Sequence, residues 1–160
     1  MKADREQKPL NQCYICAKHR GDIAFPGDTI YEDEFVKVVH ASMLDGADTM
    51  YLGYLMVETK RHALGWAELS VEEAQAVGRA TALLGRALKA VAPVEHVYSF
   101  VLGHHVPHFH LQIVPRYEGA PREYWGVKVT DWPEAPQGNE EDIRRLCERL
   151  REFLADHACE

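Results

Sequence analysis

The sequence predicts an α+β domain built on a largely antiparallel sheet. Short runs of β-branched and aromatic residues, typical of strands, lie on both sides of a long amphipathic helix, and a second amphipathic helix follows near the end. With 160 residues, of which 46% are hydrophobic and 27% charged, the chain is long and apolar enough to bury one core. It has no internal repeat and no linker rich in Gly, Pro or Ser, so we expect a single domain over residues 1–160.

Five runs predict the strands of this sheet. They occupy residues 29–32, 35–40, 51–58, 94–102 and 109–115. The third contains an uninterrupted apolar stretch, and the segment before it, SMLDGADTM, is typical of a loop. The last two runs are joined by the turn GHHVP, which holds two of the nine histidines.

Two helices are predicted from their caps and their apolar spacing. Ser70 followed by Glu73 forms a capping box, and Pro93 ends the helical run. The apolar positions of this run are Val71, Ala74, Val77, Thr81, Leu84, Leu88 and Val91. Asn139 is the expected cap of the final helix. The apolar stripe of that helix is Ile143, Leu146, Cys147, Leu150 and Leu154. The stretch before it, residues 118–138, predicts an ordered but irregular segment.

The composition argues against several classes of protein. A formal net charge of −7 is unfavourable for binding a nucleic-acid backbone, which requires clustered Lys and Arg, although a single nucleotide in a pocket needs no such patch. No stretch approaches the roughly 20 consecutive apolar residues of a membrane span. The N-terminus, MKADREQKPLNQ, is polar where a signal peptide is apolar. We therefore expect a soluble cytoplasmic protein with no membrane partner.

The segment HFHLQIV carries the strongest functional signal. Because successive side chains of a strand point to opposite faces, His108, His110 and Gln112 share one face, and the apolar residues between them share the other. Four of the nine histidines lie between residues 104 and 110, which favours a functional site over a solvated polar face. Imidazole serves as metal ligand, as general acid or base, or as nucleophile. Gln112 is a poor ligand for a catalytic metal but a good hydrogen-bond donor, and it favours phosphoryl chemistry.

At this point the chain resembles a known family. HVPHFHLQIVPRY, residues 105–117, is similar to the signature of the histidine triad (HIT) proteins. CYIC, YEDEFVKVV, GYLMVETKRH and the long helix precede it in the family's order, so the resemblance covers residues 13–117 and leaves 118–160 without a motif. It implies a five-stranded antiparallel sheet with one long helix, followed here by a C-terminal helix. It also implies a homodimer that hydrolyses or transfers nucleotide groups.

The resemblance assigns roles to the histidine-bearing strand. His110 matches the family's nucleophile, which attacks the α-phosphorus of a nucleotide and forms a covalent nucleotidyl-histidine. Attack requires a neutral imidazole, and a hydrogen bond from its other nitrogen to a backbone carbonyl would fix that tautomer. His108 would line the same catalytic face. Arg116 and Arg122 are further candidates for a phosphate contact, with ordinary solvation as the alternative.

Several positions depart from the family's pattern. Gln112 replaces the third histidine of the triad, as in the branch that resembles galactose-1-phosphate uridylyltransferase and the dinucleoside tetraphosphate phosphorylases. A glutamine cannot protonate a leaving group, so a transferase or phosphorylase is as well supported as a hydrolase. Gly103, His104 and His105 stand where the family has Gly-Gln-Ser beside the phosphate, and His40 stands where many members hold the ribose with an aspartate. All four are candidate substrate-binding residues.

The cysteines predict a metal site. Cys13 and Cys16 have the spacing of zinc ligands, although a redox pair or two buried small residues fit the spacing as well. The resemblance implies a structural zinc bound by Cys13, Cys16, His62 and His108. His19 and His104 are rival candidates for the fourth ligand. Cys147 is expected in the core and Cys159 at the surface, and we expect no organic cofactor.

The sequence is therefore consistent with three different functions. The first is a nucleotide hydrolase or nucleotidyltransferase working through His110. The second is a nucleotide-binding module with little turnover, because His40 and His105 alter the expected substrate contacts. The third is a metal-dependent hydrolase that uses the histidine cluster as catalytic ligands.

Overall fold

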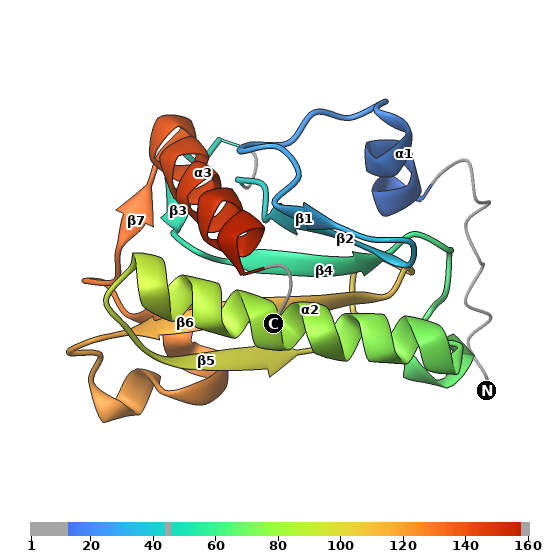
Figure 1. Ribbon diagram of the computed structural model, residues 1–160. Helices are drawn as coiled ribbons and strands as arrows, with labels where there is room; N and C mark the ends of the chain where they lie inside the picture. Colours follow the sequence, from blue (N-terminus) through green and yellow to red (C-terminus); the bar gives the residue numbers. More distant parts are fainter. Residues whose placement is uncertain (1–12, 44–45, 158–160) are drawn as a thin grey trace.

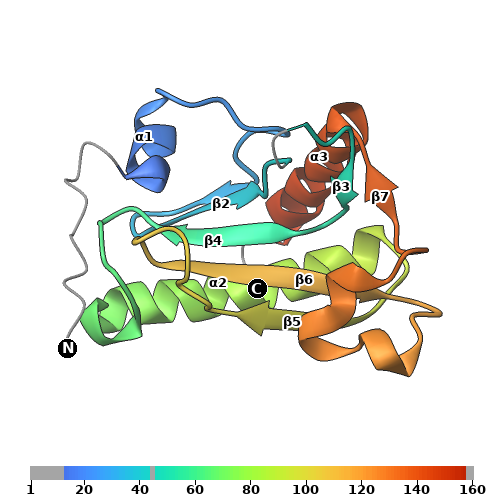
Figure 2. The same cartoon turned by 180° about the vertical axis from the view of Figure 1, so that it is seen from behind.

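A computed structural model describes residues 13–43 and 46–157. The polar N-terminal segment, two residues of the predicted loop at 42–50 and Cys159 lie outside these ranges. Figure 1 shows one sheet whose near face is crossed by the long helix α2 (Val71–Val91), with α3 (Glu140–Asp156) beside it. The opposite face is seen in Figure 2, where the 118–138 segment lies against one end of the strands.

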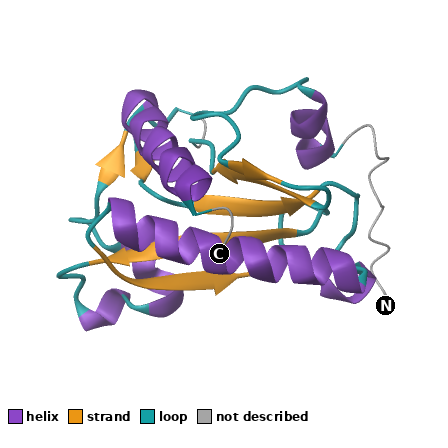
Figure 3. Ribbon diagram, in the orientation of Figure 1, coloured by secondary structure: helices purple, strands orange, loops and turns teal. Residues whose placement is uncertain are grey.

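The main sheet has five strands in the order β1-β2-β4-β6-β5, and every neighbouring pair is antiparallel. The strands are β1 (Tyr31–Glu32), β2 (Val36–His40), β4 (Leu55–Thr59), β5 (Val94–Phe100) and β6 (His110–Tyr117). The predicted α+β class and the five-stranded antiparallel sheet are thus confirmed (Figure 3). In the register of β4 with β6, Glu58 lies opposite His110 and Met56 opposite Gln112.

The prediction of one strand over residues 51–58 is wrong. This stretch forms β3 (Met50–Tyr51), a turn, and then β4. Gly53 makes the turn with a φ of 78°, and a Cβ there would lie 2.9 Å from the side chain of Pro115. β3 pairs with β7 (Gln137–Gly138) in a separate two-stranded sheet. The apolar run hid this break because both strands are buried and hydrophobic patterning continues across the turn.

Both predicted helix starts are confirmed. Ser70 accepts a hydrogen bond from the backbone of Glu73 and Glu73 returns one, and Asn139 and Asp142 form the same reciprocal box at the start of α3. The predicted stripe of α2 is partly wrong, because Val71 is 69% exposed. Relative to the predicted stripe, the buried face of α2 is turned so that it includes three further alanines. Its apolar members are Ala76, Val77, Ala80, Leu84, Ala87 and Leu88.

The alternation of β6 separates core from site. Leu111 and Ile113 belong to the core together with the buried face of α2, and Phe109 just before the strand joins them. Side chains at 110, 112, 114 and 116 point to the other face. There Arg116 is buried under the irregular segment, which contains two short 3-10 helices, η3 (Arg122–Tyr124) and η4 (Gly126–Asp131). Within the described residues, no helix has the length and hydropathy to cross a membrane.

A short helix that the sequence did not predict, α1 (Tyr14–Arg20), lies beside the ends of β2 and β4 in Figures 1 and 2. It ends at Gly21, whose φ of 86° is the left-handed conformation common after helices. At seven residues it is too short to be stable in isolation, so tertiary contacts must hold it in place.

Candidate functional site

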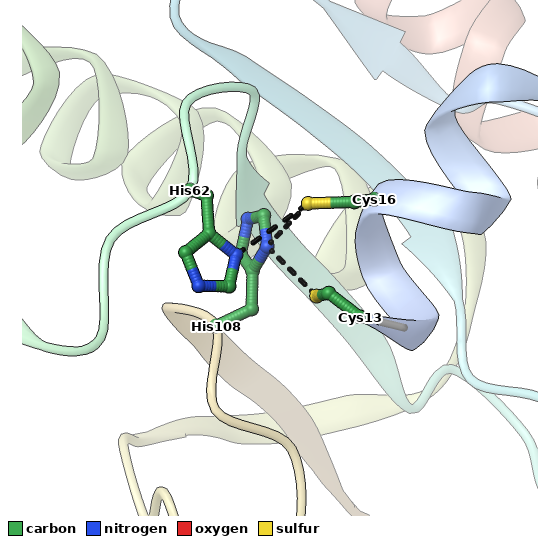
Figure 4. A group of neighbouring side chains, drawn as sticks. All are labelled: Cys13, Cys16, His62 and His108. Atoms are coloured by element: carbon green, nitrogen blue, oxygen red, sulfur yellow. Dashed lines mark hydrogen bonds between the residues drawn. The ribbon is translucent and has the colours of Figure 1, made fainter. Parts of the chain in front are cut away.

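Two cysteines and two histidines converge between α1 and the sheet. Cys13 caps α1 and Cys16 lies in its first turn, His62 follows β4, and His108 lies just before β6 (Figure 4). Their ligand atoms all lie within 4.8 Å of one another. The structure therefore brings together the four residues that the resemblance implied as metal ligands.

Three of the six distances between these atoms have the length expected in a tetrahedral zinc site. The Nδ1 atom of His108 lies 3.4 Å from the Sγ atom of Cys13 and 3.4 Å from that of Cys16, and Nδ1 of His62 lies 3.5 Å from Sγ of Cys16. Zinc–sulfur and zinc–nitrogen bonds of about 2.3 and 2.05 Å in a tetrahedron place such atoms roughly 3.5 Å apart. Cys13 and His108 are each 1% exposed, so the site is closed to solvent on their side.

Hydrogen bonding prepares His108 as a ligand. Its Nε2 donates to the carbonyl of Thr59 over 2.7 Å, which leaves the Nδ1 lone pair directed at the two thiols. Burial, the largest cause, and neighbouring histidines lower the pKa of His108 to about 4, so the ring is neutral. Burial and the nearby Cys13 raise the pKa of the Cys16 thiol to about 11. Two thiolates would be unfavourable here without a cation, so this donor set fits a bound metal.

His110 occupies a different environment two residues further along the same strand. Its Nδ1 donates to the carbonyl of His108 over 2.7 Å, so the Nε2 lone pair remains available. The side chain lines a pocket of about 250 Å³, whose walls come from α1, residues 41–43 after β2, the outer face of β4 and Val106. A neutral imidazole held in this way can act as a nucleophile or as a base.

Gln112 is held by Tyr54, which lies immediately before β4. The hydroxyl of Tyr54 donates to Oε1 of Gln112 over 2.7 Å. Burial raises the pKa of Tyr54, so the hydroxyl keeps the proton that it donates. Because Oε1 is engaged, the NH₂ group of the amide is the part of Gln112 left to donate to another group.

A buried charge cluster beside His110 was missed by the sequence reasoning. Lys18 and Glu58, only 5% and 2% exposed, form an ion pair, and Nε2 of His19 lies 2.9 Å from the other carboxylate oxygen of Glu58. Burial raises the pKa of Glu58, but the bonds from His19 and Lys18 outweigh it and hold the pKa below its usual value. The available signal was a glutamate inside the apolar run GYLMVET. His19, a rival zinc ligand from the sequence, is engaged here instead.

His40 has no nitrogen left for a ribose hydroxyl. It is fully buried, its Nδ1 donates to the carbonyl of Ala41 over 2.9 Å, and its Nε2 accepts from the backbone N–H of Gly53 over 3.0 Å. The imidazole thus fastens the turn between β3 and β4 to the end of β2. It contributes to the fold rather than to the wall of the pocket.

The loop before β6 is only partly in contact with the pocket. Gly103 turns the chain with a φ of 64°, and Val106 lines the pocket. His104 and His105 are exposed, and neither lines this pocket or joins the metal cluster. Any contact they make with a substrate is therefore to a part outside the pocket.

Arg116 is explained by packing. It is 7% exposed, its guanidinium lies 3.6 Å from the centre of the Trp125 ring, and it donates to the hydroxyl of Tyr98 over 3.1 Å. An ion pair with Glu95 completes these contacts. Arg122 is exposed on the irregular segment. Neither arginine lines the His110 pocket.

Comparisons with known proteins bear on the fold. No protein-family model matches the sequence, and no curated protein is significantly similar to it. Among solved structures, a zinc-bound histidine triad family protein from Mycobacterium smegmatis is similar with a TM-score of 0.68 at 20% identity, over 92% of this chain and 96% of that one.

Two further structures are similar to the same degree. A HIT-like protein involved in cell-cycle regulation from Bartonella henselae has a TM-score of 0.68 at 19% identity, over 90% of this chain and 98% of that one. A hypothetical histidine triad nucleotide-binding protein from Sulfolobus tokodaii has a TM-score of 0.68 at 19% identity, over 90% and 93% of the two chains. At such identities similarity establishes architecture, and we conclude that this chain has the histidine triad fold.

Proposed function

We propose that this protein is a nucleotide hydrolase or nucleotidyltransferase that acts at the α-phosphate through a covalent intermediate on His110. One observation carries the proposal: Nδ1 of His110 is committed to the carbonyl of His108, 2.7 Å away, in a side chain that lines a pocket. This arrangement keeps the Nε2 lone pair available for attack without a separate base. The similarity to a protein described as nucleotide-binding supports a nucleotide as the substrate.

The reaction proceeds in two displacements. Nε2 of His110 attacks the α-phosphorus, a P–N bond forms, and the bond from phosphorus to the leaving group breaks with its electron pair going to the leaving group. Positive charge that develops on the ring is stabilised by the Nδ1–H···O=C bond to His108. An incoming water or phosphate oxygen then attacks the same phosphorus and forms the new P–O bond, while the P–N bond breaks and its electron pair returns to Nε2 of His110. When water attacks, its proton is released to solvent.

Gln112 limits the leaving groups that this site accepts. Its amide, oriented by Tyr54, can donate to a phosphoryl oxygen but has no proton to give to a leaving amine or alkoxide. A leaving group that is stable as an anion needs no such proton. We therefore infer that the substrate loses a phosphate, pyrophosphate or nucleoside polyphosphate, and that hydrolysis and transfer to phosphate are both open to this site.

The metal that fits the Cys₂His₂ cluster is a structural zinc. Cys13, Cys16, His62 and His108 would hold it, and four protein ligands would leave no open position for a substrate or a reactive water. The similar mycobacterial protein is described as zinc-bound. The zinc would fasten α1, which forms one wall of the pocket, to the strand that carries His110.

We also infer a homodimer. The strand β5 is an edge of the sheet, it is seven residues long, and four of those residues are intermediate or buried while three are exposed. An edge strand of this length presents unpaired backbone groups that a second copy can pair with. Light scattering across a dilution series tests the stoichiometry.

Trapping the intermediate tests the proposed function. The protein is incubated with α-³²P-labelled nucleoside triphosphates and dinucleoside polyphosphates, quenched in alkali, and analysed for an acid-labile adduct by mass spectrometry. Label on His110 supports the proposal. Binding without an adduct identifies a nucleotide-binding module instead, and turnover that a chelator abolishes without unfolding identifies a metal-dependent hydrolase.

A further inference from the structure

One buried ion pair lies in the wall of a mainly apolar pocket. The lining beside His110 includes Ile15, Met43, Met56 and Val106, yet Lys18 and Glu58 also line it. Both charged side chains are almost fully buried, at 5% and 2% exposure. Polar groups of this kind, few in number and set in an apolar wall, commonly fix the orientation and identity of a ligand.

Burial of this ion pair is not by itself a source of stability. Taking two charges out of water costs several kcal/mol, and apolar side chains of similar volume often stabilise a protein as well or better. α1 has a second attachment to the sheet through the Cys13 and Cys16 cluster. Glu58 on β4 is also the register partner of His110 on β6, and the side chains of such cross-strand partners are neighbours. A costly pair at this position therefore calls for an explanation in the chemistry of the pocket.

Lys18 and Glu58 have hydrogen-bonding positions that their bonds to one another and to His19 do not use. The carboxylate of Glu58 receives one bond at each oxygen, from Lys18 and from His19, and each oxygen has a second lone pair. The ammonium of Lys18 uses one of its three N–H groups on Glu58. By valence, the carboxylate therefore has two acceptor positions to spare, with a cationic donor beside them, and both residues belong to the wall of the pocket.

We propose that Lys18 and Glu58 select the base of the nucleotide and that the preferred base is guanine. This inference rests on the proposed function, because it requires the α-phosphorus at His110 and the base one ribose further along the pocket, on the side of α1. Guanine alone among the four common bases presents two adjacent N–H donors, N1–H and the 2-amino group, beside a carbonyl oxygen. The two donors match the carboxylate and the carbonyl matches the ammonium. Apolar neighbours such as Ile15 and Met56 would cover the faces of the ring.

Matched nucleotides test the selection. GTP, ITP and ATP carry the same leaving group, and ITP differs from GTP only in lacking the 2-amino group. Single-turnover rates of adduct formation on the 160-residue, zinc-loaded protein should favour GTP over ITP by roughly tenfold or more, the usual effect of one hydrogen bond to a charged group, and over ATP by at least as much. Equal rates on GTP and ITP, or a preference for ATP, would overturn the proposal.

A double variant identifies the residues responsible. Lys18→Met with Glu58→Leu replaces the pair by apolar groups of similar volume, and its zinc content and melting temperature report whether the fold is kept. We expect adduct formation on all three nucleotides with the GTP to ITP ratio near one. A GTP to ITP ratio that equals the parental value would contradict the assignment of base selection to Lys18 and Glu58. If this variant does not fold, Glu58→Gln is tested in its place. Its amide NH₂ group would face the N–H donors of guanine, so the ratio of the GTP rate to the ITP rate should again fall toward one.

The two proposals fail in distinguishable ways. If no nucleotide gives an adduct, the proposed function is lost, but the Kd values for GTP, ITP and ATP from calorimetry still test the base preference. A Kd for GTP that is about tenfold lower than the Kd for ITP, and that the double variant raises to the ITP value, supports the selection by Lys18 and Glu58. Equal Kd values reject it.

Discussion

His108 and His110 lie two residues apart and differ in which nitrogen is committed to the backbone. In His108 the Nε2 atom donates to the carbonyl of Thr59, and Nδ1 faces two thiols at 3.4 Å. In His110 the Nδ1 atom donates to the carbonyl of His108, and Nε2 is available in a pocket. Both rings are fixed by a carbonyl 2.7 Å away, yet opposite nitrogens are left with the lone pair. His108 therefore offers Nδ1 to the cysteine cluster, as the proposed metal ligand requires, and His110 keeps Nε2 free, as the proposed nucleophile requires.

The burial and the neighbours of His108 and His110 also differ. His108 is 1% exposed, and four protein ligand atoms gather around one point beside it. His110 is half-buried and borders a cavity that a small molecule can enter. One face of a strand thus passes from a closed site to an open one within two residues. The same residue type can thus serve two kinds of site, because the carbonyl to which one ring nitrogen donates determines which nitrogen keeps its lone pair.

Removal of the His110 imidazole provides the largest test of the comparison. We expect His110→Ala to lower kcat by at least roughly 10³-fold, because the covalent route has no other nucleophile, while the free energy of unfolding changes by less than about 1 kcal/mol. Single-turnover kinetics and urea unfolding measure the two effects. The matched control is His157→Ala, which removes a histidine at the end of α3, outside the pocket and the metal cluster, and should leave turnover unchanged. Full activity in His110→Ala would end the nucleophile assignment.

Loss of a thiol tests the other side of the comparison. We expect Cys13→Ala to lose bound zinc and about 3 kcal/mol of stability, roughly 10 °C in Tm, because metal binding contributes to folding. Elemental analysis and calorimetry check both quantities. Cys147→Ala is the control: Cys147 is equally buried, packs near Gly27 and lies outside the cluster, so zinc should be retained. Equal metal content in the Cys13 variant and the parent would contradict the site.

Local patterns predicted the histidine-bearing strand well. The alternation at 108–113 depends only on the period of a strand, and the caps at Ser70 and Asn139 depend on residues three positions apart. For this reason the sheet, both main helices and the strand that carries His110 could be predicted from sequence.

Features that depend on distant contacts could not be predicted in this way. α1 is seven residues long and lies against a sheet whose strands come later in the chain. The break at Gly53 serves the pairing of β3 with β7, some 85 residues further on. The Lys18–Glu58 pair joins residues forty positions apart. His40 was expected to contact the substrate, and its bond to the backbone of Gly53 could not be foreseen from the sequence around it. No local pattern contains these pairings.

His40 extends the comparison to an imidazole with both nitrogens engaged. Burial lowers its pKa below the usual 6.5, more than the carbonyl of Ala41 raises it, so the folded protein keeps the ring neutral. As the pH falls through about 6.5, the unfolded chain binds a proton that the folded chain does not. Stability should therefore decrease toward acid, by up to about 1.4 kcal/mol per pH unit from this residue.

The variant His40→Gln isolates this contribution. Glutamine has no proton to gain in this range, so its stability should fall less steeply between about pH 7.5 and 5.5, although it starts lower because the bonds to Ala41 and Gly53 are disturbed. Urea unfolding of both proteins at several pH values, with zinc present, gives the two slopes. Parallel slopes would show that His40 takes up its proton in the folded state too.

Tyr54→Phe is expected to have the smallest effect, and it concerns Gln112, two residues from the proposed nucleophile. Without the hydroxyl that donates to Oε1 over 2.7 Å, the amide of Gln112 can turn and present its oxygen to the phosphoryl group. We expect a loss of about threefold to tenfold in the rate of adduct formation, with a change in stability near 1 kcal/mol, the size of one net hydrogen bond. Gln112→Glu is the informative companion, because a carboxylate would repel the phosphoryl oxygens and should slow the step much more. If both variants form the adduct at the parental rate, Gln112 does not contact the phosphate, and the stabilisation of the transferred group must come from elsewhere on the His110 face.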